Sequence, residues 1–357
     1  MANTLDGWVV SAAACASMNR GVSFKIGLAG LAAAAALAGA GSLLAQSHAQ
    51  AQSLPPESVQ PPRHTTPWPV LGTGNTRADQ ARSLSMGPEM ERGTSPREML
   101  RERKRLDDAL AKLAPQRPGV IDAYVVTVAL DSDPVFAREA REAGNVLGRR
   151  YNAQNRTLVL AGPDGRSAGL PKGSITALMV ALGHIAETMD RNEDVLVLYT
   201  TSHGLQQGLA YHYGDTGFGI LSPQRFRASL QDLAIKRRVL ILSACYAGVF
   251  VPYLSTPDTA ILTASRADRT SFGCRAENDW TYFGDALING ALRKPQGLEA
   301  ASTEARSDIA GWERRGGLPN SFPQTAIGSN AAQWLAQLEG SIPKGTTERV
   351  GRPAVQP

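Results

Sequence analysis

The fold is decided by residues 195–204, which read VLVLYTTSHG. The apolar and β-branched residues that begin this stretch are typical of a strand buried on both faces of a sheet. Residues 238–248 follow the same pattern, because an apolar run leads into Ser-Ala-Cys-Tyr-Ala-Gly. Strands buried on both faces occur mainly in parallel sheets, so these two stretches predict the centre of an α/β domain.

The rest of the α/β pattern lies on either side of these two stretches. Three more short strands are expected at residues 124–130, 157–160 and 259–263. Capping residues before apolar runs predict helices that begin at Asp133-Pro134, Ser174 and Ser222-Pro223. The Gly-rich segment before Ser222 is expected to hold a hairpin. We therefore predict a mostly parallel sheet flanked by helices on both faces, which is a three-layer αβα arrangement.

The first 51 residues differ in composition from a folded domain. Arg20 and Lys25 precede an uncharged run, residues 26–45, and small-residue patterns of the A-x-A kind follow it. This order is typical of a secretory signal, and the run is also long enough to be an uncleaved N-terminal anchor. We expect a periplasmic or secreted protein, or alternatively an inner-membrane anchor with a periplasmic catalytic domain.

Two further segments flank the predicted α/β domain. Residues 52–94 are rich in Pro, Ser and Gln and are expected to form an extended linker. Residues 95–117 are expected to be a basic helical lead-in, with Ser95 as the N-cap and Glu98 completing a capping box. Residues 341–357 are expected to be a disordered tail.

Composition and charge exclude several classes of protein. The 357 residues are 43% hydrophobic and include 3 Cys, which disfavours a disordered chain and a disulfide-dense scaffold. The net charge is +5, but the densest basic run, residues 97–105, is interleaved with acidic residues and lacks aromatics. That pattern indicates a solvated helix face, so nucleic acid is not expected as a partner. A membrane is expected as a partner only if the N-terminal segment stays uncleaved, and the oligomeric state is left open.

The chemistry is expected beyond the carboxyl ends of the two central strands, where open α/β sheets gather their reactive groups. His203 follows one strand and Cys245 follows the other. A cysteine nucleophile needs a neighbouring base, and an imidazole titrates in the required range. Gly204 would leave its N–H approachable, so that the N–H groups of Gly204 and Cys245 could stabilise an oxyanion. These residues predict covalent acyl transfer.

The stretches around His203 and Cys245 resemble the His-Gly and Ala-Cys blocks of the legumain-like cysteine peptidases, family C13 of the caspase-like clan. Segments similar to the bacterial branch of that family are residues 135–139, 194–199, 267–274, 280–284 and 323–328. The resemblance covers roughly residues 118–340, which it identifies as the catalytic domain. It implies a caspase/legumain-like fold and an endopeptidase that uses a His203/Cys245 dyad, a polypeptide substrate and an acyl-enzyme intermediate. No cofactor and no metal are expected.

The sequence departs from the family at positions tied to substrate specificity. Where legumain-type enzymes carry Asn-Tyr-Arg-His, this chain has Asp131-Ser132-Asp133-Pro134, and Ser243 stands in place of a Glu before the nucleophile. The Asn preference of legumain therefore does not follow from the resemblance. The resemblance makes Ser243, Ser265 and Asp268 candidate substrate-binding residues. Asp131 or Asp133 is a candidate for orienting His203.

Several alternatives stay open. An amine instead of water could resolve the acyl-enzyme, which would make the chain a transamidase or ligase, and a non-catalytic binding domain could share the fold. Cys245 and Cys274 could form a disulfide in an oxidising compartment, but catalysis requires free thiols, which we expect. Four histidines are expected to be structural: His48, His64, His184 and His212. Of these, His184 and His212 are expected not to face a strand end. A metal site formed by Cys245, Cys274, His203 and His212 lacks the usual ligand spacing.

Overall fold

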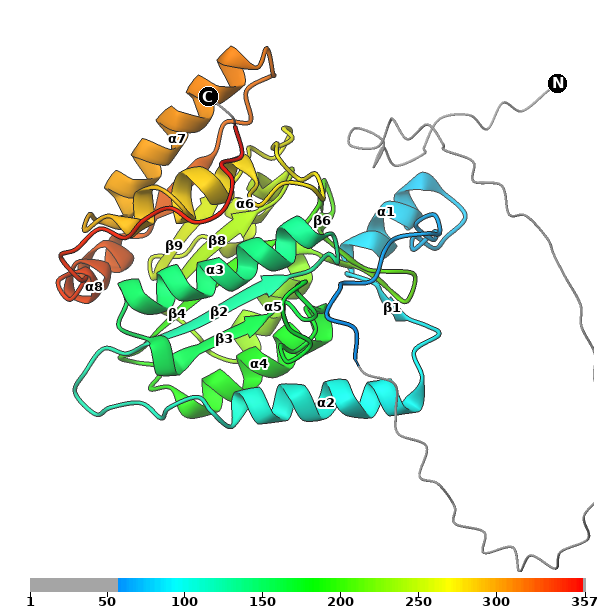
Figure 1. Cartoon of the computed structure of the whole chain (residues 1–357), viewed down its shortest axis with the longest axis horizontal. Coiled ribbons are helices and arrows are strands. Elements are labelled where there is room, and N and C mark those ends of the chain that lie inside the picture. Colours follow the sequence, from blue (N-terminus) through cyan, green and yellow to red (C-terminus); the bar gives the residue numbers. More distant parts are fainter. Residues whose placement is uncertain (1–56, 356–357) are drawn as a thin grey trace, which may run out of the picture. The chain divides into compact units, whose positions relative to one another are not determined.

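The computed structural model describes residues 57–355, which form a central six-stranded sheet covered by helices (Figure 1). The strand order is β10-β9-β8-β4-β2-β3. The strands are β2 (Ala123–Ala129), β3 (Thr157–Leu160), β4 (Val195–Thr201), β8 (Arg238–Ser243), β9 (Thr259–Thr263) and β10 (Gln324–Ile327). The first five are parallel, and β10 is antiparallel to β9 at one edge. The five strands predicted from the sequence are confirmed.

Helices cover both faces of this sheet, as predicted for a three-layer α/β fold. One face packs against α2 (Pro96–Leu110), α4 (Ile175–Thr188), α5 (Pro223–Asp232) and α6 (Val251–Leu254). The other face packs against α3 (Pro134–Arg150), α7 (Leu298–Arg315), α8 (Ser329–Glu339) and the short turns η4 (Gly284–Ile288) and η5 (Ala291–Arg293). Two further short turns are η2 (Gln154–Arg156) and η3 (Ala247–Phe250). The layers therefore enclose the sheet between two apolar cores.

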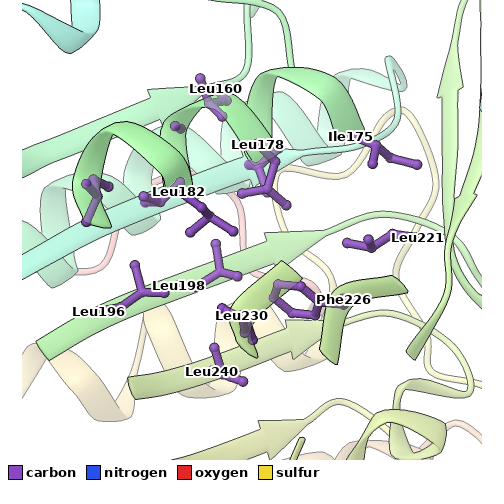
Figure 2. Close-up of a cluster of buried hydrophobic side chains, with 14 of the residues drawn as sticks. Leu160, Ile175, Leu178, Leu182, Leu196, Leu198, Leu221, Phe226, Leu230 and Leu240 are labelled. Carbon is purple, nitrogen blue, oxygen red and sulfur yellow. The ribbon is translucent and has the colours of Figure 1, made fainter. Parts of the chain in front are cut away.

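Successive side chains along β4 pack alternately into the two cores. Leu196 and Leu198 face the core formed with α4 and α5, whereas Val197 and Tyr199 face the core formed with α3. Figure 2 shows Leu196, Leu198 and Leu240 beside the side chains of α4 and α5. A strand that is apolar at every position is required here, because neither of its faces reaches water.

Serine caps set the starts of three helices, as the sequence predicts. The hydroxyl oxygens of Ser95, Ser174 and Ser222 each accept a hydrogen bond from the N–H three residues further along. Proline follows the first and third of these serines, at a position where a helix needs no N–H donor.

A second, smaller sheet lies beyond the carboxyl end of β4. Its order is β1-β7-β6-β5, formed by β1 (Glu89–Glu91), β7 (Gly217–Leu221), β6 (Gly208–Tyr213) and β5 (Gly204–Leu205). The hairpin predicted in the Gly-rich segment is β6–β7. Because β5 begins directly after His203, this sheet holds the backbone next to the predicted catalytic residue.

The expectation of an extended linker at residues 52–94 is wrong for the part that the structure describes. Residues 77–85 form α1 (Arg77–Ser85), and β1 pairs with β7. Both side chains at the ends of β1 make ion pairs, Glu89 with Arg225 and Glu91 with Lys172. The segment is ordered by partners that are distant in sequence, which composition does not reveal. Residues 1–56, with the predicted signal or anchor, lie outside the described residues.

The expectation of a disordered tail is also wrong for residues 341–355. The Trp280 indole donates to the Val350 carbonyl at 2.7 Å, and the Val350 N–H donates to Asn289 Oδ1 at 2.8 Å. The Ala354 N–H donates to Asp285 Oδ2 at 2.7 Å. Asn289 and Asp285 are buried, so the tail satisfies polar groups that would otherwise be costly to bury.

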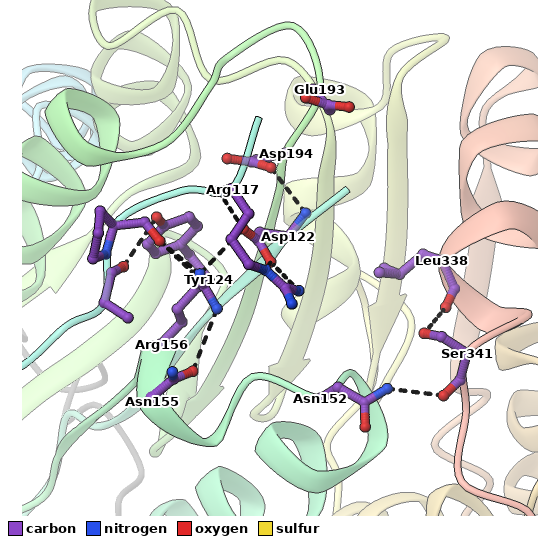
Figure 3. A network of polar contacts seen from close by, with 12 residues as sticks. Arg117, Asp122, Tyr124, Asn152, Asn155, Arg156, Glu193, Asp194, Leu338 and Ser341 are labelled. Carbon is purple, nitrogen blue, oxygen red and sulfur yellow. Dashed lines mark hydrogen bonds and ion pairs between the residues drawn. The ribbon is translucent and has the colours of Figure 1, made fainter. Parts of the chain in front are cut away.

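A polar network ties together the amino ends of the central strands (Figure 3). Asp122, just before β2, accepts from the Arg117 guanidinium at 2.7 Å, and its carboxylate lies 3.3 Å from Arg156. Asp194, just before β4, accepts from the Asp122 N–H at 2.9 Å. The network lies at the end of the sheet opposite to His203 and Cys245, and it links the starts of β2 and β4.

Among residues 57–355, no helix has the length and apolar character that crossing a membrane requires.

Replacing Leu198 with alanine should lower the free energy of unfolding by about 3 kcal/mol, because the side chain is fully buried in the core with α4 and α5 and its truncation leaves a cavity. Chemical denaturation followed by circular dichroism measures this change. Leu100→Ala is the matched control, since Leu100 is 56% exposed and its truncation should change the stability by less than about 0.5 kcal/mol. Equal effects of the two substitutions would contradict the assignment of the core.

Candidate active site

The register between β4 and β8 places His203 and Cys245 together at the carboxyl end of the sheet. Thr201 lies directly opposite Ser243, and each candidate residue comes two positions further along its own strand. The backbones also approach closely here, because a Cβ atom on Gly204 would lie 1.9 Å from the Cys245 carbonyl oxygen. Only glycine fits at position 204. The structure thus brings together the two segments that the sequence singles out.

The Cys245 thiol lies against Ser271, on the segment that follows β9. Its Sγ accepts a hydrogen bond from the Ser271 N–H at 3.2 Å and lies 3.6 Å from the Ser271 hydroxyl. The N–H donor favours the thiolate, whereas the Ser271 carbonyl oxygen, 3.5 Å from Sγ, accepts a hydrogen bond from the thiol form. The next residue, Tyr246, has a φ of 58° and its N–H donates to the Arg269 carbonyl. A left-handed residue directly after Cys245 turns the chain into η3 and leaves the thiol half-buried at the strand end.

His203 lies between an acidic side chain and an aromatic ring. Its Nε2 is 3.5 Å from Asp133 Oδ2, and its ring packs edge-on against Phe136 with centroids 5.0 Å apart. Asp133 occupies the N-cap position of α3 without a side-chain cap bond, and its carboxylate lies between His203 and His64, with Oδ1 3.7 Å from His64 Nε2. Of the two aspartates predicted to orient His203, Asp133 makes the direct contact.

Asp131 is instead buried in a cluster with two histidines that the sequence analysis assigned to structural roles. Asp131 Oδ1 lies 2.9 Å from His64 Nε2, and the His64 ring stacks on His212 with centroids 3.5 Å apart. His212 is on β6, which runs beside Asp131 at the end of β2. The expectation that His212 lies away from a strand end is therefore wrong. The hairpin carries it there, and hairpin placement depends on contacts distant in sequence.

The two histidines of this cluster have pKa values shifted in opposite directions. Burial opposes a charge on His64, but the hydrogen bond and the negative charge of Asp131 outweigh it and raise the pKa of His64 to about 9. Burial lowers the pKa of His212 to about 4. Burial works against ionisation of Asp131 as well, yet the bond from His64 holds the pKa of Asp131 below its ordinary value. At neutral pH, these pKa shifts favour a charged His64 paired with an ionised Asp131, beside a neutral His212.

Glu139 of α3 is a buried carboxylate that bonds to residues at the carboxyl ends of the central strands. It accepts hydrogen bonds from the hydroxyls of Tyr199, Thr201 and Ser243 and from the Thr281 N–H. Burial raises the pKa of Glu139, and the surrounding donors partly offset this effect. One side chain therefore joins β4, β8 and the segment before η4.

Glu139 was missed in the sequence analysis, although a signal was present. It lies on the same helical face as Phe136, Ala140 and Ala143, all of which are buried. A charged residue on an apolar helix face requires internal partners, and these are commonly at functional sites or strand ends.

The three predicted substrate-binding residues differ in their surroundings. Ser243 and Ser265 are buried, and their hydroxyls donate to Glu139 and to the Ala244 carbonyl, respectively. Asp268 is exposed and forms an ion pair with Arg266. Substrate contact by these side chains remains a prediction. The observed bonds of the two serines stabilise the backbone around the nucleophile.

Cys274 is half-buried and packs against the apolar cluster that contains Phe136. The expectation that both cysteines are free thiols in the active protein stays a prediction, which quantitative thiol labelling of the native chain tests.

Two groups of side chains among residues 57–355 place potential metal ligands within 4.8 Å of one another. They are His64, Asp131 and His212, and Asp131, Asp133 and His203. The second group includes the candidate catalytic histidine. The chemistry available at the strand ends is therefore nucleophilic attack by a thiolate with an imidazole beside it, next to a carboxylate-histidine cluster.

One family model matches the part of the chain that contains the candidate site. Residues 173–332 match a family model described as the Peptidase C13 family, which confirms the family resemblance for a segment that contains both His203 and Cys245. The bacterial branch stays an expectation. The crystal structure of caspase-1 from Spodoptera frugiperda is similar over 60% of this chain and 92% of that chain, with 12% sequence identity and a TM-score of 0.38. No curated protein matches the chain.

Replacing Glu139 with alanine should lower the free energy of unfolding by about 3 kcal/mol, because several buried donors lose their acceptor. Glu139→Gln keeps the shape and one acceptor oxygen, so it should cost less than half as much. Denaturant titration measures both changes, with Glu187→Ala on the exposed side of α4 as the control. An unchanged stability of Glu139→Ala would show that these bonds do not hold the strand ends together.

Proposed function

We propose that the chain, whose residues 173–332 match the model of the peptidase C13 family, is a cysteine endopeptidase that acts through Cys245 and His203. The coarser conclusion, a cysteine-type hydrolase acting on polypeptides, follows from the family. The roles of single residues are our proposal. The main observation in its support is the β4–β8 register: Thr201 pairs with Ser243, and His203 and Cys245 each follow two residues later.

In the proposed first step, His203 takes the proton of the Cys245 thiol and Sγ attacks the carbonyl carbon of the scissile bond. A C–S bond forms, and the carbonyl oxygen becomes an oxyanion. Breakage of the C–N bond then releases the C-terminal fragment as an amine, which receives the proton from His203. The N-terminal fragment remains as a thioester on Cys245.

Water completes the proposed cycle. His203 removes a proton from water as the water oxygen attacks the thioester carbonyl, and the C–S bond breaks. The departing Sγ takes the proton back from His203, so the products are the carboxylic acid of the N-terminal fragment and the Cys245 thiol. The N–H groups of Gly204 and Cys245 are proposed to donate to the oxyanion in both steps, which is supported by the close approach of the two backbones.

Two neighbouring residues support the proposed chemistry without reacting. The Ser271 N–H stabilises the Cys245 thiolate. Asp133 stabilises the imidazolium that forms on His203 and holds its ring. Export to the periplasm or beyond the cell, through a cleaved or uncleaved N-terminal segment, remains part of the proposal.

The full chain should cleave peptides varied at the acyl-side residue, and Cys245→Ala should lower kcat/KM by roughly 10³-fold or more. Cys274→Ala is the matched control and should keep the wild-type rate. Mass spectrometry of the products, with and without added amine, distinguishes a free acid from an amide.

Three outcomes of this experiment would contradict the proposal in different ways. Equal turnover by Cys245→Ala would exclude the cysteine mechanism. A product that carries the added amine as the main species would indicate the transamidase alternative. A wild-type chain that turns over none of the peptides would favour a non-catalytic binding domain.

Asp133→Asn should lower kcat about tenfold, equivalent to about 1.4 kcal/mol, because the imidazolium of His203 loses its negative neighbour. KM should stay unchanged, since Asp133 is proposed to act on His203 and not on the substrate. Steady-state kinetics separate the two parameters, and Asp232→Asn on the exposed face of α5 is the control. A change in KM alone would instead assign Asp133 to substrate binding.

A further inference from the structure

Three side chains from distant parts of the chain meet beside the proposed catalytic histidine. His64 comes from the segment before α1, Asp131 from the end of β2 and His212 from β6. One nitrogen or oxygen from each lies within 4.8 Å of the others. Two imidazoles and one carboxylate form a donor set that is typical of transition-metal sites.

Bonds around the cluster orient His64 and Asp131 toward each other, and the His64 and His212 rings are stacked with centroids 3.5 Å apart, so the two rings must separate for both to bind one ion. The His64 Nδ1 lies 3.2 Å from the Gly214 carbonyl, so Nε2 is directed at Asp131. The Asp133 N–H donates to Asp131 Oδ1 at 2.8 Å. Such outer contacts fix the tautomer and the orientation of metal-binding histidines and carboxylates.

The second oxygen of Asp131 supplies an independent observation. The Asp131 side chain is fully buried, and its Oδ2 has no hydrogen-bond partner among residues 57–355. That oxygen lies 3.9 Å from His212 Nδ1, so it is aimed at the third side chain of the cluster. An ionised carboxylate oxygen without a donor is costly to bury, and a cation between Oδ2 and the two rings would satisfy it.

We propose that His64, Asp131 and His212 bind one divalent transition-metal ion of the Zn²⁺ class. Three protein ligands leave a fourth tetrahedral position for water. Two imidazole nitrogens favour Zn²⁺ and its neighbours over Ca²⁺ and Mg²⁺, which prefer sites built of oxygen atoms. On binding, the ion takes the place of the proton on His64 Nε2, and that proton is released to solvent.

The bound ion fastens the N-terminal segment to the catalytic end of the sheet. That segment already contacts the site through Pro62, whose carbonyl accepts from the Ser132 hydroxyl, and through Thr65 and Thr66, which donate to Asp215. Asp131 is two residues from Asp133, the neighbour of His203. The ion therefore couples the placement of residues 58–68 to the surroundings of the catalytic histidine.

The purified full chain, first stripped with a chelator, is titrated with Zn²⁺ and followed by isothermal calorimetry. We expect one equivalent to bind, with an affinity lowered at least tenfold in His64→Gln and in His212→Gln. His184→Gln, which alters a histidine outside the cluster, should bind as the wild type does. Cys245→Ala should also retain the affinity, because the proposed site does not use the catalytic thiol.

Cobalt supplies a second readout that does not depend on any variant. Co²⁺ bound to the wild type should give visible d–d bands without a thiolate charge-transfer band, since no sulfur ligand is proposed. Circular dichroism checks that each variant is folded. All of these measurements report binding alone, so they are independent of whether the chain hydrolyses peptides.

Four results would overturn the proposal. They are no binding by the wild type, binding that is unchanged in both cluster variants, loss of binding in Cys245→Ala with a thiolate band in the cobalt spectrum, and several weak equivalents. The second and fourth results would mean an adventitious ion only. The third would place the ion on the catalytic dyad.

Discussion

The parallel pairing of β4 with β8 is the constraint on which the candidate site depends. Thr201 lies opposite Ser243, and this register alone sets His203 and Cys245 at equal heights beyond the sheet. Because β4 packs apolar side chains into both cores, a slip by one residue would exchange Leu196 and Leu198 with Val197 and Tyr199 between two differently packed cores and would remove the Tyr199 hydroxyl from Glu139. The two cores and the site are therefore parts of one arrangement.

Polar side chains at the carboxyl ends of β4 and β8 are buried and need hydrogen-bond partners. Glu139 provides this support by accepting hydrogen bonds from both β4 and β8. On the opposite end of the sheet, Asp122 and Asp194 link the starts of β2 and β4. Buried carboxylates that are fully hydrogen-bonded thus hold the central strands at both ends, and the site is built on a rigid base.

The N-terminal segment contributes a side chain to a cluster that adjoins the proposed catalytic dyad. It places His64 against Asp131, and the small sheet places His212 on the other side of the same carboxylate. The C-terminal tail is also held by partners distant in sequence, because Val350 bonds to Trp280 and Asn289. The composition of both segments predicts disorder, but contacts with residues distant in sequence hold them in place.

The sequence by itself determined the five parallel strands, the serine-capped helices and the positions of His203 and Cys245, because these follow from local periodicity and from groups that end a strand. Only the tertiary structure decided that Glu139 supports the strand ends and that His64, Asp131 and His212 meet. Those contacts join residues up to about 150 positions apart, as in the bond between His64 and Gly214. No local pattern encodes such pairings, because they depend on how the sheets and connecting segments pack.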